Sequence, residues 1–291
     1  MKIAIYGQNY KSEASKYIDI LLATLRENKV EVVIEFNFHK LLKERKNVRK
    51  SYQTFSSYKD LDATFDMLFT VGGDGTFLRS ITYVRDHNIP ILGINIGRLG
   101  FLANVQKGKI KEAIKSVLKK NYSVKERTLL KVTTDDLDGF NIALNEVTVV
   151  RKDSTAMITI ETYLDNEFLT SYWADGLIVS TPTGSTGYSL SCGGPVITPS
   201  ARNLVLTPIA PHNLNARPLV IPDNTKIELK VIGREKNALL SLDSRIITIQ
   251  NNTTVVINKA SYSIKTVLLN NQSFLKTLRK KLLWGEDVRN D

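Results

Sequence analysis

The chain has 291 residues, of which 42% are hydrophobic and 24% are charged, and this is enough material for two domains with sizeable cores. Its single cysteine, Cys192, excludes an internal disulfide and fits a reducing compartment. We find no signal peptide and no apolar run of about 18 residues that could span a membrane. We therefore expect a soluble, cytoplasmic protein with no membrane partner.

The net charge of +11 is compatible with a nucleic-acid partner, an acidic membrane surface or an anionic small molecule. Much of the excess lies in two basic runs, residues 39–50 and 279–281. Neither run has the interleaved aromatic residues that stack on bases, so we interpret both as solvated faces and expect no nucleic-acid partner.

The first part of the chain alternates apolar runs with segments of helical period. Strands are predicted at 2–6, 30–36, 67–71 and 90–95, and helices at 12–27, 76–87 and 110–118. Residues 39–58 have little apolar pattern and predict a short helix followed by a mobile loop. Because this alternation is typical of proteins with a parallel sheet, we expect a Rossmann-like α/β domain over residues 1–124.

The turn after the third strand reads Val71-Gly72-Gly73-Asp74-Gly75-Thr76. A strand, a glycine turn and a helix N-terminus together favour an anion site, because glycine lets backbone N–H groups turn inward and the helix adds positive potential. Asp74 would repel that anion unless it meets a hydroxyl beside a phosphate, or a metal that the phosphate carries. The alternative is a tight βα turn without a ligand.

A second glycine-rich segment, residues 93–102, lies at the carboxyl end of the next strand. Open α/β sheets bind ligands at this edge, although a plain turn would have the same composition.

Near residue 122 the helical period gives way to short strands separated by turn residues. Strands are predicted at 128–133, 142–150, 156–164, 177–180, 219–221, 226–232, 245–250 and 253–258. This spacing indicates a β-sandwich-like domain over residues 125–268. Residues 273–284 return to helical period, and we expect the segment 269–291 to pack back on the first domain.

Three polar segments interrupt the second domain. Asn145-Glu146 lies in an apolar strand, where buried polar groups need partners, and neighbouring strand residues point to opposite faces. Residues 175–195 combine glycines with seven hydroxyl side chains between Ser180 and Ser189, and we favour a ligand site there. Residues 242–245 indicate only a turn. The histidines and Cys192 are too scattered for a zinc site, so we expect no resident metal.

Together these motifs resemble those of the NAD kinase family. Residues 71–76 match its GGDG motif, 97–102 resemble the loop that follows it, and Asn145-Glu146 match its NE pair. Residues 175–195 match its long glycine- and hydroxyl-rich signature, and the resemblance covers about residues 66–245. Lipid kinases share GGDG, so the NE pair and the 175–195 segment are what select NAD kinase.

The resemblance implies transfer of the γ-phosphate of ATP, as its Mg²⁺ complex, to the 2′-hydroxyl of the adenosine ribose of NAD, giving NADP. Asp74 would accept the hydroxyl proton, and the glycines around it would hold the donor phosphates. The resemblance also implies a homodimer or homotetramer. The residues that it places at the substrates are Gly72, Gly73, Asp74, Gly75, Arg79, Asn145, Glu146, Ala156, Trp173, Asp175, Thr186, Gly187, Tyr188, Ser189, Leu190, Ser191, Ala210 and Arg245.

Two alternatives remain open from the sequence. A lipid or polyol kinase could use the same phosphate cradle. A non-catalytic nucleic-acid-binding protein would account for the net charge of +11, and it predicts tight binding that weakens steeply with salt.

Overall fold

The structure, a computed structural model, describes residues 1–48, 51–152, 157–233, 236–270 and 272–283. The chain divides into two compact units. The first comprises Met1–Glu126 and Ile264–Asp291, and the second comprises Arg127–Ser263.

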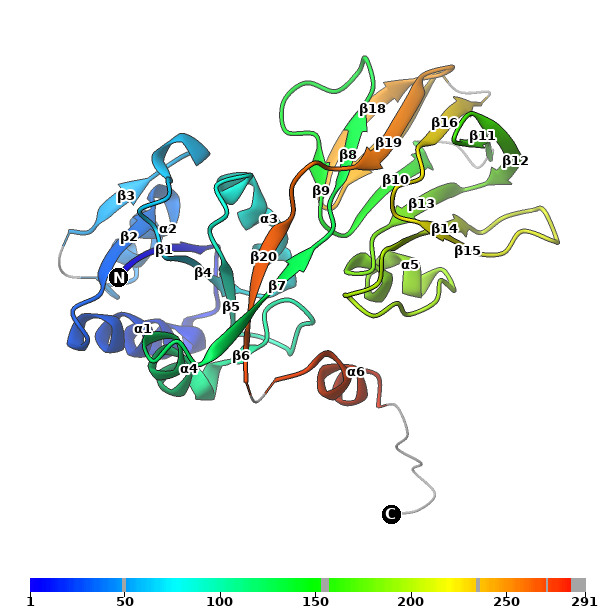
Figure 1. Ribbon diagram of the computed structural model, residues 1–291. Coiled ribbons are helices and arrows are strands. Elements are labelled where there is room, and N and C mark those ends of the chain that lie inside the picture. The colour runs from blue at the N-terminus through cyan, green and yellow to red at the C-terminus, as the bar shows by residue number, and fades with distance from the viewer. Residues whose placement is uncertain (49–50, 153–156, 234–235, 271, 284–291) are drawn as a thin grey trace, which may run out of the picture. The chain divides into compact units, whose positions relative to one another are not determined.

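The first unit is built on an eight-stranded sheet with the order β3-β2-β1-β4-β5-β20-β7, and β6 pairs with β5 (Figure 1). The pairings from β3 through β20 are parallel, in agreement with the α/β prediction. The strands are β1 (Lys2–Gly7), β2 (Glu31–Glu35), β3 (Gln53–Phe55), β4 (Met67–Gly72), β5 (Ile91–Asn95), β6 (Val105–Gln106), β7 (Tyr122–Arg127) and β20 (Ile264–Leu269).

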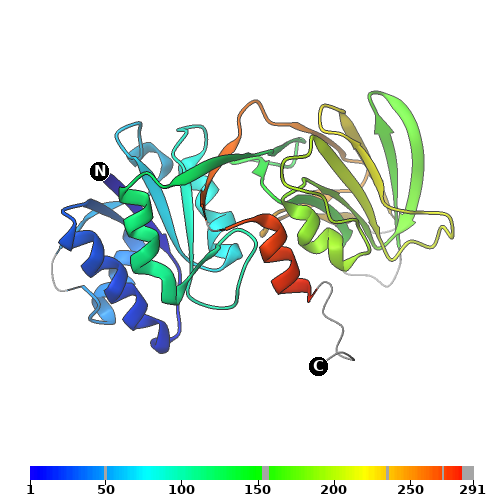
Figure 2. The same ribbon diagram turned by 60° about the horizontal axis from the view of Figure 1, so that its bottom comes forward.

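Helices of this unit bury the apolar stripes that the sequence predicts. In α1 the buried residues include Ile18, Leu21, Leu22 and Leu25, which recur at helical spacing. Figure 2 shows α1 and α4 side by side on the sheet. The helices are α1 (Ser15–Glu27), α2 (Phe36–Glu44), α3 (Asp74–Val84), α4 (Ile110–Leu118) and α6 (Phe274–Leu282), with short 3-10 helices η1 (Ser12–Ala14), η2 (Tyr58–Asp60) and η3 (Lys107–Lys109).

The structure differs from the prediction for residues 39–58. The helix α2 begins earlier, at Phe36, because the Glu35 side chain caps it by accepting the N–H of Phe38 at 2.8 Å. Within the segment expected to be a loop, Gln53–Phe55 form β3 and add a parallel strand beside β2.

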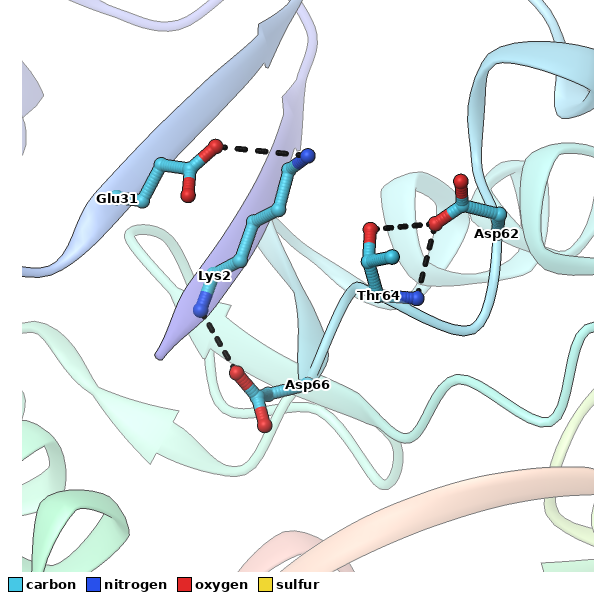
Figure 3. Close-up of polar contacts among 5 residues, drawn as sticks. All are labelled: Lys2, Glu31, Asp62, Thr64 and Asp66. Atoms are coloured by element: carbon cyan, nitrogen blue, oxygen red, sulfur yellow. Dashed lines mark hydrogen bonds and ion pairs between the residues drawn. The ribbon is translucent and has the colours of Figure 1, made fainter.

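Polar contacts fix the start of β1 against its neighbours (Figure 3). The Lys2 N–H donates to Asp66 Oδ2 at 2.7 Å, just before β4, and Lys2 Nζ lies 3.4 Å from Glu31 Oε1 at the start of β2. In the segment leading to β4, the Thr64 hydroxyl and N–H both donate to Asp62 Oδ1, and these bonds lower the pKa of Asp62. The central strands β2, β1 and β4 therefore begin in a fixed register.

The second unit contains two six-stranded sheets, with the orders β15-β14-β13-β10-β17-β18 and β12-β11-β16-β19-β8-β9. Their apolar side chains form one core, in which Val147 and Val149 of β10 join Leu229 and Val231 of β16. The elements are β8 (Leu130–Thr133), β9 (Ile142–Ala143), β10 (Glu146–Arg151), β11 (Ile158–Leu164), β12 (Glu167–Ala174), β13 (Gly176–Ser180), η4 (Gly184–Thr186), α5 (Tyr188–Ser191), β14 (Asn203–Ile209), β15 (Leu219–Pro222), β16 (Ile227–Ile232), β17 (Asn237–Leu242), β18 (Arg245–Gln250) and β19 (Thr254–Lys259).

These two architectures confirm the predicted fold class, an α/β unit and a β-sandwich-like unit. The return to the first unit starts at Ile264 rather than at the expected residue 269, because β20 pairs with β5. In α6, Phe274 lies 6.1 Å from Phe101 between ring centroids. Among the described residues, no helix is long and apolar enough to cross a membrane.

Candidate functional site

The predicted glycine turn connects β4 to α3, and Asp74 is the first residue of that helix. Its carboxylate accepts three consecutive backbone N–H groups from a distant loop. Oδ2 accepts from Phe101 at 2.8 Å, and Oδ1 accepts from Leu102 at 3.0 Å and from Ala103 at 2.9 Å. The repulsion between Asp74 and a bound anion, noted from the sequence, is therefore opposed by three N–H dipoles.

The second glycine-rich segment supplies this loop. Asn95, which is buried at the end of β5, shapes it through both amide atoms: Nδ2 donates to Arg98 O at 2.6 Å, and Oδ1 accepts from Gly97 N at 2.8 Å. At Gly100 a Cβ atom would overlap the Asp74 carboxylate. The segment therefore forms a clamp on Asp74, by which we mean the three hydrogen bonds from the N–H groups of residues 101–103. The loop can approach the carboxylate this closely because Gly100 has no side chain.

Arg79 lies one turn further along α3 and is exposed. Burial raises the pKa of Tyr6 at the end of β1, and the positive charge of Arg79 opposes that rise, so the two side chains are near each other. The same end of the sheet thus carries a cation, the glycine turn and the N-terminus of α3.

In the second unit the NE pair does not lie inside a continuous strand. β9 ends at Ala143 and β10 begins at Glu146. At this break, the Asp243 carboxylate in the β17–β18 turn accepts the N–H groups of Leu144 at 2.9 Å, Asn145 at 2.7 Å and Glu146 at 3.2 Å. The predicted strand over 142–150 is therefore interrupted, and its neighbours need not point to opposite faces, because the backbone turns at this pair.

Both members of the NE pair point toward Gly187. A Cβ atom at Gly187 would lie 3.3 Å from Glu146 Oε2 and 3.5 Å from Asn145 Nδ2. Within the described part of the chain, the buried atoms Glu146 Oε2 and Asn145 Oδ1 have no hydrogen-bond partner. Burial, and secondly the charge of Asp243, raise the pKa of Glu146 to about 8. The site therefore presents buried polar atoms that a ligand could satisfy.

The hydroxyl-rich segment is less open to a ligand than its composition predicts. Thr181 Oγ1 donates to Leu144 O at 2.6 Å, Ser185 Oγ donates to Pro182 O at 2.7 Å, and the Ser189 and Thr207 hydroxyls lie 2.8 Å apart. The side chains of Ser180, Thr181, Ser185 and Ser189 are fully buried. The Ser189 hydroxyl is thus bonded within the sandwich core, and a contact between Ser189 and a ligand stays a prediction.

Other predicted residues of this segment are accessible. Tyr188 is 44% exposed at the start of α5, and Thr186, Gly187 and Leu190 are partly buried beside it, while Ser191 is exposed. Burial raises the pKa of the Tyr188 hydroxyl, so this group stays protonated near neutral pH.

Asp175 lies just before β13 and pairs with Arg151, with 3.0 Å between Arg151 Nε and Asp175 Oδ1. The Asp175 charge also contributes to the raised pKa of Tyr188, which places the two side chains near each other. The Asp175 N–H donates to Ile209 O at 3.0 Å, so Ala210 lies beside this strand end. Asp175, Tyr188 and Ala210 are thus brought together.

The remaining predicted residues are less direct parts of the site. Trp173 is half exposed on β12, and its ring lies 4.9 Å from that of His212. The Arg245 guanidinium donates to Phe140 O and Ile142 O, so it holds β9 rather than presenting a free cation. Ala156 lies outside the described residues. Among the described residues, no group of three or more His, Cys, Asp or Glu side chains could hold a metal ion.

Sequence reasoning missed Asp243, which it read as part of a turn. Asp243 has a φ of 54°, a conformation that Asp and Asn tolerate better than most residues. This preference fits any turn, so no local signal indicated its bonds to residues almost 100 positions earlier in the chain.

Known proteins resemble this chain in both sequence and fold. Residues 3–122 match the ATP-NAD kinase N-terminal domain family, and residues 144–269 match the ATP-NAD kinase C-terminal domain family. The chain is 58% identical over 294 residues to an NAD kinase of Flavobacterium psychrophilum and 42% identical over 291 residues to one of Bacteroides fragilis. These alignments cover 100% and 99% of this chain and the whole of each relative.

Two solved structures share the fold. Yeast NADH kinase complexed with NADH matches with a TM-score of 0.89 at 23% identity, over 100% of this chain and 89% of that one. An NAD kinase from Archaeoglobus fulgidus in complex with ATP matches with a TM-score of 0.76 at 25% identity, over 97% of this chain and 99% of that one. The relatives named here are NAD or NADH kinases rather than lipid kinases, as the NE pair and the 175–195 segment predicted. The chain therefore belongs to the NAD kinase family.

Proposed function

We propose that Asp74 accepts the proton of the NAD 2′-hydroxyl when this enzyme transfers the γ-phosphate of ATP to it and forms NADP. The observation that carries this role is the clamp on the carboxylate. A carboxylate has about four lone-pair positions, and backbone N–H groups of the 101–103 loop occupy three of them. The remaining position is held in one orientation and is available to a substrate hydroxyl.

The glycine turn and the start of α3 are proposed to hold the donor phosphates. Phosphoryl transfer needs in-line placement and neutralised charge more than covalent help. Backbone N–H groups at Gly72–Gly75 supply part of that neutralisation, and Mg²⁺ bound to the ATP phosphates supplies the rest.

The second unit is proposed to bind NAD through the groups around Gly187. Glu146 Oε2 and Asn145 Oδ1 are buried and lack protein partners within the described residues, so ribose hydroxyls or amides of the dinucleotide would satisfy them. The exposed ring of Tyr188 offers a face for the adenine. Asp175, paired with Arg151, would orient hydroxyl groups of the same ligand.

We further propose that the enzyme is cytoplasmic and homo-oligomeric. Its single cysteine fits a reducing compartment. The edge strand β12 presents apolar side chains to solvent, with Phe168 54% and Trp173 51% exposed, and edges of this kind are normally covered by another chain or blocked. Sedimentation equilibrium should give two or four times the mass of one chain, and a monomer at all concentrations would contradict the assembly.

The Asp74→Asn variant tests the proposed base. We expect it to bind NAD with nearly unchanged affinity and to lose turnover by about 10²-fold or more, because an amide cannot accept the proton. NADP formation from ATP, Mg²⁺ and NAD, read by an NADP-specific dehydrogenase, measures this.

Asp66→Asn is the matched control for Asp74→Asn. Asp66 accepts one N–H in the same unit, and an asparagine oxygen can replace that acceptor. Near-normal turnover in Asp74→Asn would contradict the proposed role of Asp74 as the base. Absence of NADP formation by the natural protein would contradict the proposed function itself.

The Asp243→Asn variant tests whether the β17–β18 turn positions the NE pair. Asparagine keeps the positive φ but cannot accept three N–H groups, so we expect the KM for NAD to rise about tenfold or more, in line with a lost charge-assisted bond. Asp165→Asn is the control, since Asp165 also has a positive φ but accepts one N–H. Equal KM values in the two variants would contradict a positioning role.

The raised pKa of Glu146 predicts a pH dependence of stability without ligand. Between the ordinary pKa of 4.5 and the folded value of about 8, the folded chain holds a proton that the unfolded chain releases. Stability therefore falls as pH rises through this window. We expect Glu146→Gln to remove this contribution. The Tm of the variant minus the Tm of the natural protein should therefore increase from pH 5 to pH 8. A constant Tm difference over that range argues against the raised pKa.

A further inference from the structure

We propose that a pocket at the carboxyl ends of β1 and β2 binds the nucleoside half of the phosphate donor, that is, the ribose and base of ATP. The pocket has a volume of about 340 Å³, within the usual range for small-molecule sites. Its lining includes Gln8, Asn9, Glu35, Asn37, Leu41 and Tyr83. The inference rests on the proposed use of ATP and adds the residues that would recognise it.

The pocket adjoins the proposed phosphate site directly. Gly7, the last residue of β1, pairs with Val71 of β4, one residue before the glycine turn. Beyond this pair, the Thr76 hydroxyl in the first turn of α3 donates to Gln8 Oε1 at 3.3 Å. Gln8 lines the pocket, so pocket and glycine turn share one hydrogen-bonded contact. A ligand that fills the pocket would therefore lie beside Gln8, which is hydrogen-bonded to the first turn of α3.

The sheet topology explains why a crevice forms at this point. β1 lies between β2 and β4, and the chain leaves β1 toward β2 and β3 before it returns to β4 on the other side. Open parallel sheets bind ligands beyond the carboxyl ends of strands where the strand order reverses in this way. The reversal at β1 places the pocket on one side and the glycine turn on the other.

The polar groups of the pocket suit a sugar or base rather than a phosphate. The Glu35 carboxylate accepts from Phe38 N at 2.8 Å and from Asn37 Nδ2 at 3.0 Å, and it would repel a phosphate. Because Asn37 donates through Nδ2, its Oδ1 atom is left to accept from a ribose hydroxyl or a base amino group. Asn9 and Asn37 are both exposed at the pocket mouth, where their amides can reach such a ligand.

The remaining walls are apolar and aromatic. Phe38 and Leu41 of α2 line one side, and Tyr83 of α3 lines another. Burial and secondly the Glu35 charge raise the pKa of the Tyr83 hydroxyl, which lies 3.5 Å from Glu35 Oε1 and therefore stays a donor. Apolar walls with a few fixed polar groups are the usual surroundings of a nucleoside.

Two variants test the pocket by different means. Leu41→Trp fills it with an indole ring, and Asn37→Ala removes one amide. We expect the KM for ATP to rise about tenfold or more in Leu41→Trp and about fivefold in Asn37→Ala, the scale of one lost hydrogen bond. The KM for NAD should stay within about twofold of the natural value. Leu275→Trp, which adds the same ring at an exposed position of α6, should change neither constant.

An unchanged KM for ATP in both pocket variants, or a rise in the KM for NAD instead, overturns the inference and leaves the proposed function intact. If the natural protein makes no NADP, the proposed function fails, and calorimetric titration with ATP then decides the pocket alone. Weaker ATP binding by Leu41→Trp than by Leu275→Trp would support it, and equal binding would overturn it. Should Leu41→Trp fail to fold, Asn37→Ala carries the test, because its side chain is exposed.

Discussion

Each unit of this enzyme depends on an aspartate that accepts three consecutive backbone N–H groups. Asp74 accepts from the 101–103 loop of the first unit, and Asp243 accepts from residues 144–146 of the second. Such bonds to a charged acceptor are roughly twice as strong as neutral ones. In both units the bonded backbone belongs to the proposed site.

The same hydrogen-bonding pattern has a different consequence at each of the two aspartates. At Asp74 the bonds orient the carboxylate, and correct placement of a catalytic group beside the substrate lowers the barrier of the reaction. At Asp243 the carboxylate is buried and the backbone is what becomes oriented, so that Asn145 and Glu146 both face Gly187. The charge of Asp243 also helps to keep Glu146 protonated, which lets a buried carboxyl donate as well as accept.

Local patterns predicted most of the fold and part of the site. Helical and strand periods identified α1, β4 and several sandwich strands, because they record which face of each element is buried, but the predicted strands do not include β12, β14 and β17. The composition of residues 175–195 does not separate their roles, since a hydroxyl that bonds within the core, as Ser189 does to Thr207, looks the same in sequence as one that faces a ligand. Asp243 was also missed, because its three donors lie 97–99 positions away.

Glycines explain why some of these long-range contacts were visible in the sequence and others were not. A Cβ atom at Gly100 would overlap the Asp74 carboxylate, and one at Gly184 would overlap the carbonyl of Asn145. Where a distant group approaches the backbone this closely, only glycine fits. The contact therefore requires a glycine at that position, and this glycine can be recognised in the sequence. A carboxylate that merely accepts N–H groups constrains the neighbouring side chains little. The motifs of this family therefore mark where the backbone is crowded, and carboxylates such as Asp243 and Glu35 become recognisable only in the folded chain.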